Sequence, residues 1–422
     1  MFNDVQKRAY DAMISGKNVF LTGPGGVGKS YLITHFVQEA RKYKTVAVTA
    51  LTGIAALNLK GSTLHSYTGI GLGKGSLESI VTKIRKKKYL RDRWKNVDIL
   101  IIDEISMLSP QLFDKLETIG RVVRNNPRPF GGIQLILSGD FLQLPCIDTN
   151  DFCFSAEGWD RCIEQTFYLH KIIRQQELHF QDVLNRVRVG NVDDEAVDVL
   201  ESRTGVELSN EDGILPTVLY SHNAQVDAKN NDELLSLPDN NLYEYEWDIQ
   251  IYSTVPPAAV DVIRDHCEKW TPAVPNLILG VGAQVMLCAN LDIDGGLANG
   301  SRGVVVGFSE DKPVVRFLNG RVLTITDFLW EIEENDKKLA SVEQIPLKLA
   351  WACTLHKSQG QTLDYAILDL TRCFDYGQAY VGLSRVRSID GLSIIGYNPN
   401  KIKAHPKAVE YYEKLLASQD EM

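Results

Sequence analysis

The stretch Gly23-Pro24-Gly25-Gly26-Val27-Gly28-Lys29-Ser30 is the strongest chemical signal in the chain. Its spacing is that of the phosphate-binding loop G-x-x-x-x-G-K-[ST], in which backbone N–H groups and the start of a helix receive phosphates. Lys29 would reach the β- and γ-phosphates, and Ser30 would hold Mg²⁺. An ordinary glycine-rich turn is the alternative, but the apolar runs on both sides favour a strand–loop–helix unit. We therefore expect a nucleotide to bind through Gly23, Gly25, Gly26, Val27, Gly28, Lys29 and Ser30.

An acidic pair ends another apolar run, Ile101-Ile102-Asp103-Glu104. At the tip of a strand, Asp103 suits Mg²⁺, directly or through water, and Glu104 is then free to polarise an attacking water. Phosphoryl transfer to water needs these two tasks to be done by separate groups. The alternative is an ordinary acidic pair at a strand end, which the upstream phosphate-binding loop makes the weaker interpretation.

Four further polar residues are candidates for the same site. Gln143 follows the next apolar run and could sense the γ-phosphate, while Gln6 could read the edge of an adenine. Arg174 and Arg385 are candidate arginine fingers, which stabilise the negative charge on a transferring phosphoryl group, and their assignment depends on the family resemblance described below. Taken singly, each arginine is more often a surface or salt-bridge residue.

The elements that must position these residues follow from the hydrophobic pattern. Residues 4–16 predict a helix, with apolar residues on one face and a glycine at the end. The runs 45–48, 98–102 and 133–137 are apolar on both faces, as are strands of a parallel sheet covered on both sides. Together with the phosphate-binding loop they predict an α/β domain.

A second α/β unit is expected from a strand at 217–221 onward, and buried-strand patterns resume over 347–396. Between them, residues 278–328 contain short strands separated by turn signals such as Asn299-Gly300 and Asn319-Gly320. This region predicts a small β-barrel inserted into the second α/β unit.

The composition is that of a soluble globular protein. With 422 residues, 44% of them hydrophobic and 23% charged, the chain is too long for one core, and we expect two to four domains. No apolar run approaches a membrane span, and the N-terminus has no signal- or transit-peptide pattern. The seven cysteines are scattered without a C-x-x-C pair, so we expect reduced thiols, no zinc site and a cytoplasmic or nucleoid location.

The charge distribution is uneven. A net charge of −9 argues against a protein that coats nucleic acid by bulk electrostatics, but a local basic channel is compatible with it. The densest positive segment, residues 83–95, is either a solvated helix face, a nuclear-localisation-like run, or a contact with a nucleic-acid backbone. Its basic residues are Lys83, Arg85, Lys86, Lys87, Lys88, Arg91, Arg93 and Lys95.

An ordered set of motifs resembles the superfamily-one helicases of the 5′-to-3′ branch, the RecD-like and PIF-type enzymes. After the phosphate-binding loop these motifs are Thr49-Ala50-Leu51-Thr52-Gly53-Ile54-Ala55-Ala56, Asp103-Glu104-Ile105-Ser106-Met107, Gly139-Asp140-Phe141-Leu142-Gln143-Leu144-Pro145, Leu355-His356-Lys357-Ser358-Gln359-Gly360-Gln361-Thr362 and Tyr380-Val381-Gly382-Leu383-Ser384-Arg385. The PIF-one family is the closer match, because Met107-Leu108-Ser109 and Phe113-Asp114-Lys115-Leu116-Glu117 resemble its signature.

The resemblance implies an α/β fold of two RecA-like lobes that bind ATP and Mg²⁺. The first lobe is expected at 1–58 and 95–165, with a wedge insertion at 59–94. The second lobe is expected at 166–277 and 346–422, with a Src-homology-three-like β-barrel insertion at 278–345. The first lobe would carry Gln6, Lys29, Ser30, Asp103, Glu104 and Gln143, and the second would present Arg174 and Arg385, with Gly360 and Gln361 beside the nucleotide.

The resemblance also implies 5′-to-3′ movement along single-stranded DNA and unwinding of duplex or structured DNA such as G-quadruplexes. The DNA-side motifs map onto Thr52, Gly53, His65, His356, Lys357 and Ser358. The hydroxyls and the lysine suit phosphates, and His65 could stack on a base, with a buried structural histidine as the alternative. The expected partners are single-stranded DNA and single/double-strand junctions, with no membrane, and we expect a monomer in solution.

Three other functions share parts of this pattern. A translocase that displaces proteins from single-stranded DNA would use the same motor without processive unwinding. A nucleotide-switched binding protein would not need the full hydrolytic set of Glu104, Gln143, Arg174 and Arg385. An RNA motor would differ from a DNA motor in its contacts to the 2′-hydroxyl of the ribose, and no motif in the sequence indicates whether such contacts are made. Because the chain lacks the long N-terminal extension of eukaryotic members, we expect a bacterial or viral source.

Overall fold

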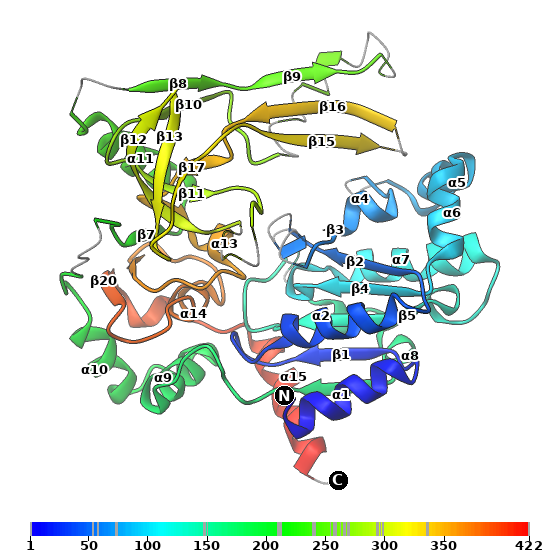
Figure 1. The fold of residues 1–422 in the computed structure, drawn as a ribbon. Coiled ribbons are helices and arrows are strands. Elements are labelled where there is room, and N and C mark those ends of the chain that lie inside the picture. The colour runs from blue at the N-terminus through cyan, green and yellow to red at the C-terminus, as the bar shows by residue number, and fades with distance from the viewer. Residues whose placement is uncertain are drawn as a thin grey trace. The chain divides into compact units, whose positions relative to one another are not determined.

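The computed structural model divides the chain into two compact units (Figure 1). The first comprises Met1–Val206, Ser358–Asp364 and Leu370–Met422, and the second comprises Glu207–Lys357 and Tyr365–Asp369. The structure describes residues 2–420 except 53–54, 57–58, 72–74, 147–148, 150, 209–212, 239–241, 254, 256–259, 262, 265–266, 268–270, 293–294, 296, 298 and 335–336.

A six-stranded parallel sheet forms the centre of the first unit, in the order β3-β2-β4-β5-β1-β6. Its strands are β1 (Val19–Thr22), β2 (Val46–Ala50), β3 (Ser62–Thr63), β4 (Ile99–Asp103), β5 (Gln134–Gly139) and β6 (Gln165–Tyr168). All residues of β1 and β4 are buried. These strands are covered on both faces, which explains why their sequences are apolar without alternation.

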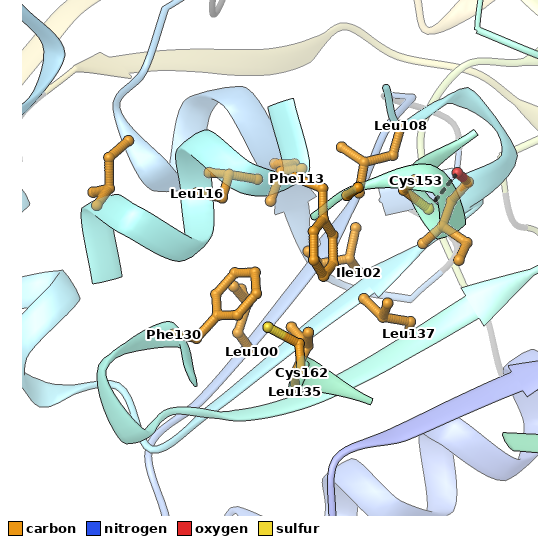
Figure 2. Close-up of a cluster of buried hydrophobic side chains, with 14 of the residues drawn as sticks. Leu100, Ile102, Leu108, Phe113, Leu116, Phe130, Leu135, Leu137, Cys153 and Cys162 are labelled. Carbon is orange, nitrogen blue, oxygen red and sulfur yellow. Dashed lines mark hydrogen bonds between the residues drawn. The ribbon is translucent and has the colours of Figure 1, made fainter. Parts of the chain in front are cut away.

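Successive residues of these strands enter two different hydrophobic clusters, because side chains alternate across a strand. Val19 and Leu21 pack with α1 and α2 on one face, whereas Phe20 points into the cluster on the other face. Figure 2 shows this second cluster, in which side chains of α7 and a neighbouring turn lie over β4 and β5. Its labelled members include Phe113, Leu116, Phe130, Leu100, Ile102, Leu135 and Leu137.

Several helices of the first unit begin at residues with recognisable caps. Asn3 and Gln6 form a capping box at the start of α1, and Ser109 caps α7 ahead of Pro110. The helices are α1 (Asp4–Ile14), α2 (Lys29–Ala40), α4 (Leu64–Thr68), α5 (Leu77–Lys86), α6 (Lys88–Asn96), α7 (Pro110–Arg124), α8 (Trp159–Cys162), α9 (Leu178–Arg188), α10 (Asp194–Ser202), α14 (Gln378–Leu383) and α15 (Pro406–Asp420). The unit also contains strand β20 (Leu392–Tyr397) and the 3₁₀ turns η1 (Ile105–Met107), η2 (Pro129–Gly132), η3 (Cys153–Ser155) and η5 (Pro399–Lys401).

The second unit combines a parallel sheet with antiparallel ones. Strand β7 (Thr217–Tyr220), which precedes α11 (Asn223–Leu235), pairs in parallel with β18 (Ala352–Thr354) and β19 (Ala366–Leu370). The short helix α13 (Leu355–Ser358) follows β18. A five-stranded antiparallel sheet has the order β14-β13-β12-β11-β17, and β15-β16-β9 and β10-β8 form smaller ones. These strands are β8 (Tyr243–Glu246), β9 (Asp248–Ile251), β10 (Asn276–Leu279), β11 (Gln284–Leu287), β12 (Arg302–Ser309), β13 (Lys312–Phe317), β14 (Val322–Thr324), β15 (Phe328–Glu334), β16 (Lys337–Gln344) and β17 (Leu347–Leu349).

The α/β class with parallel sheets is confirmed, and the expected strands are present within a few residues of their predicted bounds. Antiparallel strands occupy residues 278–328 as expected, and β8 and β9 add earlier strands to the same region. The boundaries of the lobes, the wedge and the barrel stay predictions. Cys153, Cys162, Cys267, Cys288 and Cys353 are buried free thiols. Among the described residues, no helix is both long enough and apolar enough to cross a membrane.

Candidate functional site

The phosphate-binding loop connects β1 to α2, as its motif requires. Gly23, Gly26 and Gly28 have φ values of 135°, 81° and 86°, a region that favours glycine. Space is also restricted, because a Cβ atom on Gly23 would lie 2.1 Å from the carbonyl oxygen of Leu169. The glycines are therefore needed both for the turn and for the close approach of the chain after β6.

Lys29 begins α2, and its ammonium group lies over the loop. It donates hydrogen bonds to the carbonyl oxygens of Gly23, at 2.7 Å, and Pro24, at 2.8 Å. Burial lowers the pKa of Lys29, and the carboxylates of Asp140, Glu104 and Asp103 act in the opposite direction. The lysine thus lies among acidic groups, beside a loop shaped to receive phosphates. Ser30, the second residue of α2, is exposed.

Asp103 is the last residue of β4 and is only 6% exposed. Burial raises its pKa. Glu104 follows in the left-handed region, at φ 56° and ψ 44°, a strained conformation for a residue with a side chain. Burial, followed by the neighbouring charge of Asp103, raises the pKa of Glu104 to about 7. The two adjacent carboxylates therefore lie at a sharp turn of the backbone, at the end of β4.

Gln143 lies in the segment after β5 and is 5% exposed. Its amide oxygen accepts a hydrogen bond of 3.4 Å from Nε2 of Gln359, and the same nitrogen donates to Oε2 of Glu104 at 3.0 Å. In the sequence, Gln359 is part of a motif that predicts no role for this residue itself. The structure places it between two predicted site residues, a position that no local pattern could reveal.

Arg174 and Arg385 both lie beside the phosphate-binding loop. A Cβ atom on Gly25 would lie 3.3 Å from Nη2 of Arg385 and 3.6 Å from Nη1 of Arg174. Arg385 is 1% exposed, and its guanidinium donates to the carbonyl oxygen of Val381 at 2.7 Å. Burial, followed by the charge of Arg385, lowers the pKa of Arg174 to about 9. The structure therefore brings together two arginines that are 211 positions apart in the chain.

The short segment around Ser384 holds this arginine pair in place. Its hydroxyl accepts a hydrogen bond of 2.7 Å from Nη2 of Arg385, and its carbonyl oxygen accepts one of 2.8 Å from Nη1 of Arg174. Tyr380, one turn earlier on α14, accepts a hydrogen bond of 2.8 Å from the N–H of Gly25. Tyr380 is a second site residue that sequence reasoning missed.

An ion pair next to the site anchors the segment that carries Gln143. Arg188 of α9 donates to both carboxylate oxygens of Asp140, at 2.9 and 2.7 Å, and both side chains are buried. Nη1 of Arg188 donates to the hydroxyl of Tyr168 at 3.1 Å. Its guanidinium carbon lies 4.7 Å from the ring centroid of Tyr412 in α15. The site is thus connected to the last helix of the chain.

Gln6 contacts the loop from α1. Its Nε2 donates to the carbonyl oxygen of Val27 at 3.2 Å, and its Oε1 accepts from the N–H of Asn3 at 3.0 Å. Gly360 has a φ of 79°, and the carbonyl oxygen of Gln361 accepts a hydrogen bond of 3.5 Å from Arg385. These predicted residues all belong to the first unit.

The predicted DNA-side residues come from both units. Thr52 lies two residues after the end of β2, and His65 lies two residues after the end of β3. The last residues of these two paired strands, Ala50 and Thr63, lie opposite each other. Thr52 and His65 therefore lie at the carboxyl edge of the sheet. His65 is half-buried, and burial lowers its pKa. Gly53 lies outside the described residues.

The other predicted DNA-side residues lie on α13. His356 and Lys357 belong to the second unit and Ser358 to the first, where it is fully buried. Thr354 accepts a hydrogen bond of 3.3 Å from the N–H of Lys357, which orders the start of this helix.

The donor set suits a hard cation held partly by phosphates. In the described part of the chain, no three His, Cys, Asp or Glu side chains gather to form a metal cage. Mg²⁺ normally takes only one or two protein carboxylates besides water and substrate phosphates. The buried carboxylate of Asp103 and the hydroxyl of Ser30, at the start of α2, fit that requirement.

Comparison with known proteins identifies a family that this chain resembles. A family model described as PIF1-like helicase matches residues 1–198, and a model of the 2B domain of DNA helicase Pif1 matches residues 271–308. The ATP-dependent DNA helicase PIF1 of Xenopus laevis is 40% identical over 97% of this chain, which spans 64% of that protein.

Solved structures match over the whole chain. A crystal structure of Pif1 helicase from Candida albicans is 37% identical, with a TM-score of 0.86 over 98% of this chain and 99% of that one. A crystal structure of Pif1 helicase from Bacteroides, in complex with ADP-AlF3 and single-stranded DNA, is 29% identical, with a TM-score of 0.71 over 99% and 98% of the two chains. On the strength of these matches, which together cover nearly all of this chain, and of the nucleotide site described above, this chain belongs to the PIF1-like helicase family.

Proposed function

We propose that this protein is an ATP-dependent DNA helicase that moves 5′-to-3′ along single-stranded DNA and unwinds duplex or structured DNA. The observation that carries the proposal is the convergence of Lys29, Glu104 and both arginines in one unit. Lys29 interacts with Glu104, and the two guanidinium groups lie next to Gly25 of the loop. A protein that only binds nucleotide does not require such a carboxylate and two arginines around its phosphate site.

The residues divide the work of hydrolysis between them. Backbone N–H groups of the loop and Lys29 bind the phosphates, and Glu104 polarises the attacking water. Ser30 and Asp103 would hold Mg²⁺, which neutralises charge on the phosphate oxygens when bound. Arg174 and Arg385 stabilise the charge that spreads over the γ-phosphoryl group during transfer. Gln143 senses whether that group is present.

Arg174 and Arg385 would also couple ATP binding to movement of the protein. They reach the loop from α14 and from the chain after β6, and Ser384 bonds to both. Because two guanidinium groups repel each other, a γ-phosphate between them would stabilise their close approach, and its loss would favour separation. We propose that this cycle drives translocation, as in other enzymes where substrate closes a site.

DNA contacts are proposed to come from both units. Thr52 at the sheet edge and Lys357 of α13 would contact phosphates, and His65 would stack on a base. The predicted contact of Ser358 would require its side chain to become exposed, because it is fully buried in this structure. The lowered pKa of His65 keeps its ring neutral, which suits stacking more than phosphate binding. The basic residues of α5 and α6 would add electrostatic attraction to the DNA backbone. We expect the protein to be a monomer in solution.

A strand-displacement experiment tests this proposal. Partial duplexes carrying either a 5′ or a 3′ single-stranded tail are incubated with protein, with and without ATP and Mg²⁺. We expect unwinding from the 5′ tail alone, and only with ATP. Unwinding from the 3′ tail would overturn the polarity. DNA-stimulated ATP hydrolysis without unwinding would instead indicate a translocase.

A further inference from the structure

We propose that Gln359 is a positioning residue that couples DNA binding to ATP hydrolysis. Its amide group holds Glu104 and Gln143 in one arrangement, and its backbone continues directly from the segment 356–358 that we propose to contact DNA. The inference rests on the proposed function and adds to it the residue that connects the two sites.

The geometry around Gln359 is specific. One nitrogen, Nε2, serves two acceptors, Oε2 of Glu104 at 3.0 Å and Oε1 of Gln143 at 3.4 Å. Glu104 follows β4, whereas Gln143 follows β5. Among the residues that the structure describes, no direct hydrogen bond joins these two side chains, so they are connected through Gln359.

Gln359 does not behave as an ordinary structural glutamine. It is 5% exposed, and its Oε1 atom is buried without a hydrogen-bond partner among the residues that the structure describes. A buried amide with an unsatisfied oxygen costs stability, and an aliphatic side chain of similar size would avoid that cost. The amide is therefore better explained by the acceptors that its nitrogen holds than by packing.

The backbone around Gln359 can transmit a displacement. Ser358 is fully buried, and its carbonyl oxygen accepts a hydrogen bond of 3.0 Å from the N–H of Gln361. Gly360, between them, has a φ of 79°. This tight turn leaves Gln359 little freedom of its own, so that movement of Lys357 or Ser358 on binding DNA would move the amide as well. Consecutive Cα atoms are about 3.8 Å apart, so the connection from Lys357 to Gln359 is short.

Two variants remove the donor in different ways. Gln359→Leu keeps the approximate size but has no polar group, and Gln359→Glu keeps the shape but has no N–H. The measurements are kcat and KM for ATP hydrolysis, with and without a saturating mixed-sequence single-stranded oligonucleotide, and the dissociation constant for that oligonucleotide. We define the stimulation ratio as kcat with DNA divided by kcat without it.

We expect both variants to lower kcat with DNA by about 10- to 100-fold, the loss typical of misplaced catalytic groups. The KM for ATP and the affinity for DNA should change by less than about twofold, because the interaction acts on the reaction rather than on binding. The stimulation ratio should fall toward one. A folded variant with the wild-type stimulation ratio, or with a change in KM alone, would overturn the inference.

A matched control comes from the opposite end of β5. Nε2 of Gln134 also donates to two acceptors, the carbonyl oxygens of Met13 and Lys17 at 2.7 and 2.9 Å. Gln134→Leu removes a comparable pair of bonds far from the site, and it should leave kcat and the stimulation ratio unchanged. Loss of stimulation in this control as well would mean that destabilisation, not positioning, explains the result.

A double-mutant comparison separates positioning from a direct role. In a Glu104→Gln background, Gln359→Leu should lower single-turnover hydrolysis by less than about twofold further, because the group that it positions is already lost. A fully additive loss would overturn the inference. A wild-type protein without DNA-stimulated hydrolysis would overturn the proposed function as well, whereas normal Gln359 variants would overturn this inference alone.

Discussion

Removing the carboxylate of Asp140 should destabilise the first unit strongly. Asp140 is fully buried and accepts two hydrogen bonds from Arg188, whose own side chain is 5% exposed. Asp140→Ala would leave a buried guanidinium whose remaining partners, among the described residues, are the hydroxyl and ring of Tyr168 and the ring of Tyr412. Breaking a buried pair in this way costs about 3–5 kcal/mol, because the remaining charge is uncompensated. For a unit of this size that corresponds to a fall in midpoint temperature of about 10 °C.

The assay is urea- and heat-induced unfolding followed by circular dichroism, at several pH values. Burial alone would raise the pKa of Asp140, but the charge and hydrogen bonds of Arg188 hold it below its usual value. A group whose pKa is lower in the folded state stabilises the protein above its unfolded pKa, about 3.9 for aspartate. The difference between wild type and variant should therefore be constant near neutral pH and shrink as the pH falls below that value.

Two comparisons make the reasoning refutable. Adding Arg188→Met to Asp140→Ala removes the orphaned charge and should recover part of the lost stability. Glu410→Ala breaks the exposed pair between Glu410 and Lys414 and should not shift the midpoint measurably. If Asp140→Ala is no less stable than Glu410→Ala, or if the double variant is less stable than the single one, the uncompensated-charge argument is wrong.

Three further predictions concern activity. Lys29→Ala should abolish ATP hydrolysis and leave DNA affinity largely intact; normal turnover in an ATPase assay would contradict the nucleotide-site assignment. Glu104→Gln should still bind ATP but hydrolyse it about 10²- to 10⁴-fold more slowly, as expected for loss of a general base, and a wild-type rate in stopped-flow measurements would exclude that role. Replacing Lys86, Lys87 and Lys88 with alanine should weaken DNA binding and flatten its dependence on salt; an unchanged affinity and slope in a fluorescence titration would mean that the basic segment is only a solvated helix face.

The sequence by itself determined the local units. The phosphate-binding loop was predicted because glycine, lysine and serine at fixed spacing between two apolar runs leave few alternatives, and it lies between β1 and α2 as expected. The strands ending at Ala50, Asp103 and Gly139 were predicted because continuous apolar runs identify strands covered on both faces. The basic segment 83–95 was also visible, but its division into α5 and α6 at Lys87 was not.

Only the tertiary structure decided which distant side chains meet. Arg174 and Arg385 were candidates by resemblance, yet their approach to Gly25 depends on how α14 and the chain after β6 fold back on the loop. Gln359 and Tyr380 lay inside recognised motifs, but their partners Glu104 and Gly25 are hundreds of positions away. Local spacing encodes strands, turns and loops because their hydrogen bonds join near neighbours. Contacts of this length depend on the packing of whole elements, and no short pattern of residue types specifies them.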